Sequence, residues 1–370
     1  MKNQLIRLNN FNKEIKVYHN EYIKQINKVL NSGWFILGSQ VEKFEKEFAK
    51  YLGAKYCIGV GNGLEAIQVS FMALGVGKDD EVITTPVSAV ATVLAIIAVG
   101  AKPVFVDTDE NGLINIDLIE DSITKKTKAI LPVHLYGQAV NLDKLISICK
   151  KYKLFLVEDA AQAHGSTFKG KKLGTFGKVN AFSFYPTKNL GCFGDGGAIV
   201  TNSGKLAKIC RQIRDYGQEE KYIHKKYGLN SRLDELQAAI LQVKLKYLDK
   251  NNKKRRVLAK RYLNNLSKLN IRVIGGDNIS DNNFHLLVIR VKDRDKLGSC
   301  LKLDGIESGV HYPLIIPDQP FLKDTYKDIP FPVSRKFVKD ILSLPINSYL
   351  KLAEVDYICE VISEFEQKID

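Results

Sequence analysis

Metal-binding and disulfide patterns are missing from this sequence. Its 370 residues include only six cysteines and six histidines, and neither type recurs at the spacing of a metal site or a disulfide framework. No apolar run reaches the length of about 18 residues that a transmembrane helix needs. The first residues also lack the apolar stretch of a secretory signal. We therefore expect a cytoplasmic protein with reduced thiols, no metal and no membrane contact.

Acidic residues are outnumbered in the chain. Lys and Arg number 55 against 41 Asp and Glu, a formal net charge of +14, which favours an anionic partner: nucleic acid, a membrane surface or a small substrate. The densest basic run, residues 250–256, contains no aromatic residue and matches no nucleic-acid-binding motif. We interpret this run as the solvated face of a helix, and we expect an anionic small substrate and no nucleic acid.

The sequence has no internal repeat, and from about residue 54 to 202 short apolar strands alternate with helical patterns. The predicted strands are residues 56–60, 81–85, 103–107, 129–134, 154–158, 181–185 and 198–201. Several are nearly continuous in aliphatic and aromatic residues, as strands buried on both faces are. This alternation predicts an α/β domain with a mainly parallel sheet, whose ligand site lies beyond the carboxyl ends of the strands.

A second, smaller α+β domain is predicted after this sheet. A long helical pattern covers residues 231–268, and a strand at 284–291 and a helix at 353–365 follow it. We place the large domain at residues 1–245 and the smaller one at residues 246–370.

A glycine-rich turn follows the first predicted strand. Residues 59–63 read GVGNG, and Leu64, Ile67, Phe71 and Leu74 then recur at helical spacing. A strand, such a turn and a helix start can present backbone N–H groups to a phosphate. An ordinary strand–helix turn would have the same pattern.

Two further strands end in ionisable groups. The strand at 154–158 runs into the carboxylates Glu158 and Asp159, which either flank a site or cap the next helix. The strand at 181–185 is followed closely by Lys188. A lysine in a partly apolar pocket loses its proton more easily and can then form a Schiff base, whereas outside such a pocket it is a surface lysine.

Together these motifs resemble the DegT/DnrJ/EryC1/StrS family of sugar aminotransferases, which are fold-type-I enzymes dependent on pyridoxal phosphate (PLP). The segments EDAAQAH at 158–164, SFYPTKNLG at 183–191 and GLNSRLDELQAA at 228–239 are highly specific to it, and the similarity runs from residues 33–38 to 342–345. The resemblance implies PLP as the cofactor. It also implies the fold-type-I transferase architecture, with a large domain around a mainly parallel central sheet and a smaller C-terminal α+β domain.

The match further implies roles for single residues. Lys188 would carry the cofactor and shuttle the catalytic proton, while Asp159 would pair with the pyridine nitrogen and Gln162 would hydrogen-bond the 3-hydroxyl. Asn230 would reach the phosphate from the neighbouring subunit, which implies a homodimer with shared active sites. The remaining phosphate ligands would be Gly63, Leu64 and Ser183.

The finer resemblance is to the branch that aminates C-3 of dTDP-linked 3-keto-6-deoxyhexoses. It implies L-glutamate as the amino donor and a dTDP-3-amino-3,6-dideoxyhexose as the product, made for surface polysaccharide. Substrate contacts are expected from Val90, His164, Tyr185, His311 and Tyr312. A 4-aminotransferase acting on a UDP-linked 4-keto sugar and a non-catalytic PLP-fold sensor are the alternatives.

Three residues depart from the family pattern. Val90 stands where relatives often place an aromatic ring against the PLP face. Ile315 and Pro317 stand where a proline and a histidine are common, in a loop that we expect to border the substrate pocket. These departures therefore bear on which sugar and which nucleotide the protein binds.

Overall fold

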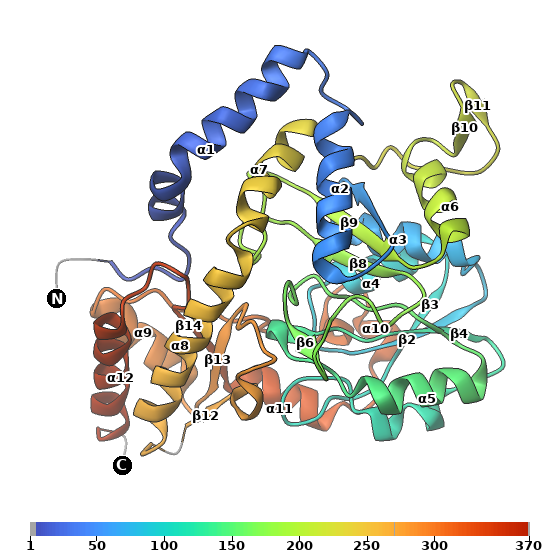
Figure 1. Cartoon of the computed structure of the whole chain (residues 1–370). Coiled ribbons are helices and arrows are strands. Elements are labelled where there is room, and N and C mark those ends of the chain that lie inside the picture. The colour runs from blue at the N-terminus through green and yellow to red at the C-terminus, as the bar shows by residue number, and fades with distance from the viewer. Residues whose placement is uncertain (1–4, 270, 369–370) are drawn as a thin grey trace.

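The computed structural model describes residues 5–269 and 271–368 (Figure 1). Its α-helices are α1 (Phe11–Ser32), α2 (Ser39–Leu52), α3 (Gly63–Leu74), α4 (Ala91–Ala98), α5 (Leu142–Tyr152), α6 (Gly204–Arg214), α7 (Glu235–Leu245), α8 (Leu248–Leu266), α9 (Arg294–Leu303), α10 (Lys323–Tyr326), α11 (Pro332–Asp340) and α12 (Leu352–Glu366). Its strands are β1 (Tyr56–Val60), β2 (Glu81–Thr84), β3 (Lys102–Phe105), β4 (Thr127–Leu131), β5 (Phe155–Leu156), β6 (Thr167–Phe168), β7 (Lys171–Lys172), β8 (Asn180–Ser183), β9 (Gly197–Thr201), β10 (Gln218–Glu220), β11 (Ile223–His224), β12 (Arg272–Val273), β13 (Leu287–Arg290) and β14 (Ile341–Leu344).

The central sheet is mainly parallel. Strands β3, β2, β4 and β5 pair in that order, and every pair is parallel. Strands β8, β9 and β1 continue the layer with two antiparallel pairs. The two parts are joined at Asp159, which forms parallel bridges to both Val133 and Ala181. Among the described strands of this layer only β9 is reversed, so the predicted α/β class is confirmed.

Helices cover both faces of this sheet because both faces of its strands are apolar. Alternate residues of a strand point to opposite faces, and the buried residues divide accordingly into two clusters. Ile58, Val82 and Leu131 pack with residues of α3, α4 and α6, whereas Cys57 and Ile83 pack with residues of α2, α5 and α7. The result is a three-layer arrangement, with the sheet between two sets of helices.

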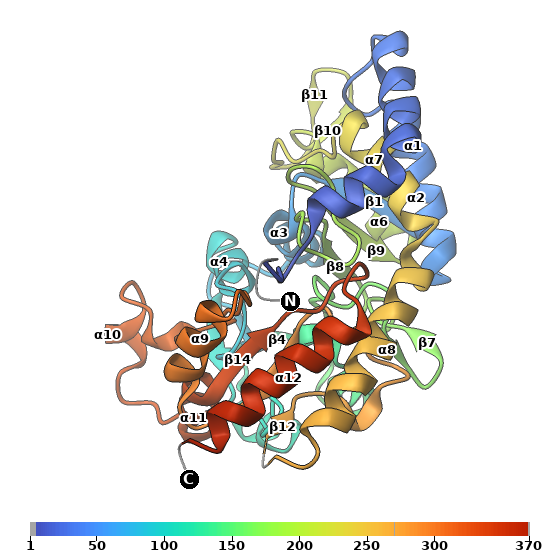
Figure 2. The same ribbon diagram turned by 90° about the vertical axis from the view of Figure 1, so that its left-hand side faces the viewer.

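A smaller antiparallel sheet, in the order β12, β13, β14, lies to the left of the central sheet in Figure 1. Its residues share a separate core with α8, α9 and α12, and α8 and α12 lie side by side in both views (Figure 2). The N-terminal segment joins this unit, because Ile6 pairs with Ile306.

The domain division at residues 245 and 246 stays a prediction. Helix α7 ends at Leu245 and α8 begins at Leu248, so the proposed boundary falls between two helices. The segment around α10 and α11 nevertheless packs into the core of the large unit, where the Tyr326 hydroxyl donates to the Pro103 carbonyl at 2.7 Å. Residues after position 246 therefore contribute to both hydrophobic cores, so a single boundary in the sequence does not separate them.

The helical pattern over 231–268 is two helices in the structure. The first begins at Glu235, whose carboxylate accepts hydrogen bonds from the first N–H groups of α2, including Gly38 and Val41. The second contains the basic run 250–256, which was expected to be solvated. That expectation was wrong for Arg255, which is 7% exposed and donates to the Ile346 carbonyl at 2.6 Å.

No helix within the described ranges combines the length and the apolar character required to cross a bilayer.

Substitution in the aromatic cluster that packs against α2 tests whether these side chains form the core of the large unit. Phe48 is 0% exposed and its ring lies 5.1 to 5.6 Å from the rings of Phe44, Phe182 and Phe184. Phe48→Ala should lower the free energy of unfolding by about 3–5 kcal/mol because it leaves a cavity. Leu303→Ala, at a position that is 89% exposed, should change it by less than about 0.5 kcal/mol. Urea unfolding followed by circular dichroism measures both, and similar losses would contradict the assignment.

Candidate active site

A cavity of about 670 Å³ opens at the carboxyl ends of the parallel strands, where the central sheet meets the smaller unit. Its wall includes Asp159 and Lys188 from the large unit, and Leu344 and Ile346 from the smaller one. Of the residues predicted to form the site, nine line the cavity: Gly63, Leu64, Asp159, Gln162, Ser183, Tyr185, Lys188, His311 and Tyr312. The sequence pattern therefore predicted residues that the fold brings together from four separate segments.

Lys188 lies in the turn that follows β8, and its backbone N–H donates to the Tyr185 carbonyl at 2.8 Å. Burial lowers the pKa of Lys188 to about 8, and the negative charge of Asp159 opposes this shift. At pH 7 an amine with this pKa is neutral in about a tenth of the molecules, a far larger share than for an ordinary lysine. Lys188 is therefore suited to act as a nucleophile and as a proton carrier.

Asp159 presents a fixed carboxylate to the cavity. It is 4% exposed, its Oδ2 accepts from the Thr92 hydroxyl at 2.8 Å, and its Oδ1 accepts from the Ala161 N–H at 3.1 Å. Burial raises the pKa of Asp159, and the hydrogen bonds and the charge of Lys188 offset this rise only in part. The carboxylate can pair with a positively charged or protonated nitrogen of a ligand.

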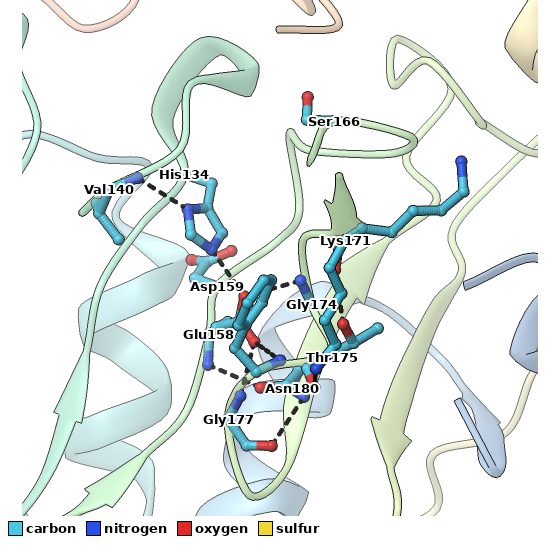
Figure 3. A network of polar contacts seen from close by, with 12 residues as sticks. His134, Val140, Glu158, Asp159, Ser166, Lys171, Gly174, Thr175, Gly177 and Asn180 are labelled. Carbon is cyan, nitrogen blue, oxygen red and sulfur yellow. Dashed lines mark hydrogen bonds and ion pairs between the residues drawn. The ribbon is translucent and has the colours of Figure 1, made fainter. Parts of the chain in front are cut away.

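The neighbouring carboxylate, Glu158, points away from the cavity because successive residues of a strand alternate in direction. It is fully buried, and Figure 3 shows it between His134 and the loop at 174–177. His134 Nε2 lies 3.0 Å from Glu158 Oε2, and the N–H groups of Gly174 and Gly177 each donate to the carboxylate at 2.8 Å. Burial alone would raise the pKa of Glu158, but these bonds outweigh it and the pKa is lowered. Glu158 thus stabilises the strand end that carries Asp159.

Gln162 orients the opposite wall of the cavity. Its Oε1 accepts from the Tyr136 N–H at 2.6 Å, so its amide nitrogen faces the Tyr312 hydroxyl, 3.4 Å away. Burial raises the pKa of Tyr312 to about 12, which keeps its hydroxyl protonated. Beside it, His311 Nδ1 lies 2.9 Å from the Ser343 hydroxyl. The wall therefore offers neutral hydrogen-bonding groups.

The start of α3 fits a phosphate. The first N–H groups of a helix have no partner within the helix and carry partial positive charge. Gly63 begins α3, and a Cβ atom there would lie 2.7 Å from Cβ of Ser183. Glycine is required by this close approach between the helix start and the end of β8. The arrangement leaves the Ser183 hydroxyl next to the helix start.

Three predicted site residues lie outside the cavity wall. Val90 precedes α4 and is 38% exposed, while Ala89 and Ala91 line the cavity in its place. His164 is 0% exposed, with its ring 5.4 Å from that of Phe182. Asn230 is exposed and pairs with Asp215. Within one chain, none of the three lines the cavity.

In the loop at 311–319, which we expect to border the substrate pocket, His311 and Tyr312 line the cavity, whereas Ile315 and Pro317 do not. Ile315 and Pro317 are buried, and the N–H of Ile316 donates to the Pro86 carbonyl at 2.8 Å. The Ile315 side chain packs into the core of the large unit, and Pro317 is buried in the turn that follows it. The two departures at these positions therefore act on packing and not through contact with a ligand in the cavity.

Several cavity residues escaped the sequence analysis. Thr92 holds Asp159, Ser88 lies 2.8 Å from the Thr92 hydroxyl, and His285 lines the wall. Thr92 and Ser88 lie in the segment that was considered only for Val90. His285 belongs to a predicted strand of the smaller domain, and no local pattern indicates which cavity that strand faces.

A model of the DegT/DnrJ/EryC1/StrS aminotransferase family matches residues 17–363 of the chain. A relative from Aneurinibacillus thermoaerophilus, a dTDP-3-amino-3,6-dideoxy-alpha-D-galactopyranose transaminase, is 44% identical over 94% of this chain and 96% of its own. A dTDP-3-amino-3,4,6-trideoxy-alpha-D-glucose transaminase from Streptomyces venezuelae is 40% identical over 93% of this chain and 92% of its own.

Two solved structures have the same fold. The crystal structure of DesV from S. venezuelae superposes with a TM-score of 0.95 at 38% identity, covering 99% of this chain and 100% of that one. The structure of NtdA from Bacillus subtilis, with bound cofactor PMP, superposes with a TM-score of 0.88 at 35% identity, covering 93% of this chain and 81% of that one.

The lowered pKa of Lys188 can be measured directly. Labelling of Lys188 by an amine-reactive reagent should rise with pH and reach half its maximum near pH 8, since the neutral amine is the reactive form. In Asp159→Asn the midpoint should move to lower pH, because the charge that favours the ammonium form is gone. Mass spectrometry of the Lys188 peptide gives both curves. A midpoint well above pH 10, typical of an exposed lysine, would contradict the description.

Proposed function

Because the chain belongs to the DegT/DnrJ/EryC1/StrS aminotransferase family, we propose that it transfers the amino group of L-glutamate to C-3 of a dTDP-linked 3-keto-6-deoxyhexose. The product is a dTDP-3-amino-3,6-dideoxyhexose. The observation that carries this proposal is the pair of Lys188, with its lowered pKa, and buried Asp159 in one cavity. The proposed setting is the cytoplasm, and the proposed use of the product is surface polysaccharide.

Pyridoxal phosphate fits this cavity. The start of α3 and Ser183 offer donors for a phosphate, Lys188 offers an amine for a carbonyl carbon, and Asp159 offers a carboxylate for a ring nitrogen. The close approach of Gly63 to Ser183 is the feature that a larger residue at position 63 would destroy. When bound, the cofactor supplies an electron sink and a carrier for the amino group.

The side chains have separate tasks in this proposal. Asp159, fixed by Thr92 and Ala161, holds a proton on the ring nitrogen. Gln162 directs its amide nitrogen to the ring hydroxyl, because its oxygen is occupied by the Tyr136 N–H. Lys188 Nζ takes the proton from the donor amino acid and returns it in the next step. The low exposure of Asp159 and Gln162 keeps water from their polar atoms.

The keto-sugar is proposed to lie against Tyr185, His311 and Tyr312. These residues line the cavity beyond Lys188, and Tyr185 is 53% exposed, which places it at the entrance. The names of the A. thermoaerophilus and S. venezuelae relatives support a dTDP-linked 3-amino sugar as the product. Val90 and His164 are left out of this assignment because neither lines the cavity.

A second subunit is proposed to complete the site. Among the described residues that line the cavity, Lys188 is the only lysine or arginine, whereas a nucleoside diphosphate needs further positive charge. Asn230 lies close to the β10–β11 hairpin, which projects from the body of the chain in both views (Figures 1 and 2). We propose a homodimer in which Asn230 of each chain reaches the phosphate in the other chain's site.

Lys188→Ala tests the chemical assignment. With PLP, the wild-type protein should show a visible absorption band that changes when L-glutamate is added, and the variant should show neither. Amino transfer should fall by about 10³-fold or more, since general acid–base catalysis alone contributes on this order. Lys302→Ala, at an exposed position on α9, is the matched control and should behave as the wild type. A variant that keeps both the band and the transfer would rule out the role of Lys188.

Mixed dimers test the shared site. Lys188→Ala and Asn230→Ala homodimers should each be impaired, and a mixture that exchanges subunits should regain activity. One site of the mixed dimer then has both the native lysine and the native asparagine. Activity is measured before and after exchange. An unchanged rate after proven exchange would place Asn230 outside the partner's site.

A further inference from the structure

His285 occupies the inner wall of the cavity without a task in the proposed amino transfer. It is 6% exposed and precedes β13 of the smaller unit. Its backbone N–H donates to the Tyr136 carbonyl at 3.1 Å and to Asn283 Oδ1 at 2.9 Å. Leu286 and Ile346 line the cavity beside it. The ring is therefore a fixed polar group in a largely apolar part of the wall.

The hydrogen bonds of Asn189 determine which ring nitrogen of His285 carries the proton. Asn189 Nδ2 donates to the Asn283 carbonyl at 3.1 Å and to Asn252 Oδ1 at 2.8 Å. The orientation of Asn252 is fixed in turn, since its Nδ2 donates to the His164 carbonyl. The Asn189 oxygen must then face His285 Nδ1, 3.2 Å away. An amide oxygen only accepts, so Nδ1 is the protonated nitrogen and Nε2 has the lone pair.

The ring is neutral, and its second nitrogen is available to a ligand. Burial lowers the pKa of His285 well below its usual range, and the positive charge of Lys188 adds to this. In the part of the chain that the structure describes, no protein group is hydrogen-bonded to Nε2. His285 therefore offers the cavity one hydrogen-bond acceptor.

A hydrogen-bond acceptor in this part of the wall favours those groups of the two substrates that can donate a hydrogen bond. Carboxylates and phosphates are acceptors only, so the carboxylates of L-glutamate and the diphosphate of the sugar nucleotide gain nothing from Nε2. Sugar hydroxyls can donate to it. Of the hydroxyls that flank C-3, the one at C-2 lies on the side of C-1 and its diphosphate, which must extend to the entrance near Tyr185. With C-1 directed to the entrance, the hydroxyl at C-4 would lie on the inner side.

We propose that His285 is a specificity-determining residue whose Nε2 accepts a hydrogen bond from the C-4 hydroxyl of the keto-sugar. The inference rests on the proposed function, since it specifies which hydroxyl of the proposed sugar substrate the site recognises. It concerns the second half-reaction only, because L-glutamate has no hydroxyl and its one donor, the amino group, is the group that is transferred. Without this acceptor the inner wall would lose the group that, in this proposal, distinguishes a sugar with a C-4 hydroxyl from a 4-deoxy sugar. The names of the relatives in the comparison include both kinds of product.

The test separates the two half-reactions in single-turnover experiments. Wild type, His285→Leu and His285→Gln are first reacted with L-glutamate and then with the dTDP-linked 3-keto sugar or its 4-deoxy analogue. His285→Leu should react normally with L-glutamate and lose about tenfold in rate or affinity with the hydroxylated sugar, the effect of one lost hydrogen bond to a buried group. His285→Gln, whose side-chain oxygen can accept, should recover part of the loss. With the 4-deoxy analogue all three proteins should react alike.

Each outcome has a distinct meaning. Equal slowing of both half-reactions in His285→Leu would overturn the proposal, because the residue would then act on Lys188 or the cofactor site. A preference for the hydroxylated sugar that survives in His285→Leu would overturn it too. If the variants do not fold, the wild-type protein still tests the proposal. Equal rates with the hydroxylated and the 4-deoxy sugar would show that no residue of the site recognises the C-4 hydroxyl. A wild type that fails to react with L-glutamate would instead refute the proposed function.

Discussion

The backbone of Asp159 joins the two parts of the central sheet, and the rest of the site depends on that junction. Its parallel bridges to Val133 and Ala181 place the end of the β5 segment between β4 and β8. The side chain that leaves this junction faces the cavity, and the segment after β8 delivers Lys188 to the same place. A carboxylate buried at a strand junction has little freedom to move, so the distance between the two ionisable groups is set by the sheet.

The two adjacent carboxylates show how one strand serves both structure and chemistry. Glu158 is enclosed by hydrogen bonds from His134 and the loop at 174–177, and nothing outside the protein can reach it. Asp159 has two bonds from Thr92 and Ala161, and its carboxylate still lines the cavity. The first holds the strand end in place, and the second remains available to a ligand.

The parts of the site that depend on local pattern were predictable from sequence. Apolar strands followed by Asp159 or Lys188 indicated an α/β fold and the edge of the sheet at which both would meet, and the glycine-rich turn indicated α3. The contributions of distant segments were not predictable in this way. Arg255 appeared to belong to a solvated run, but it binds the Ile346 carbonyl from across the smaller unit. The environment of His285 is likewise made by Asn189 and Tyr136, which lie far from it in sequence.

The central claim is that this cavity moves nitrogen from an amino acid to C-3 of a nucleotide-linked keto-sugar. The direct measurement uses the purified protein with PLP, L-glutamate carrying isotopically labelled nitrogen, and the dTDP-linked 3-keto-6-deoxyhexose, with the product analysed by NMR. The account predicts labelled nitrogen bonded to C-3 of the sugar. Label that remains in glutamate while the protein holds PLP, or that appears at C-4 of a 4-keto sugar instead, would contradict it.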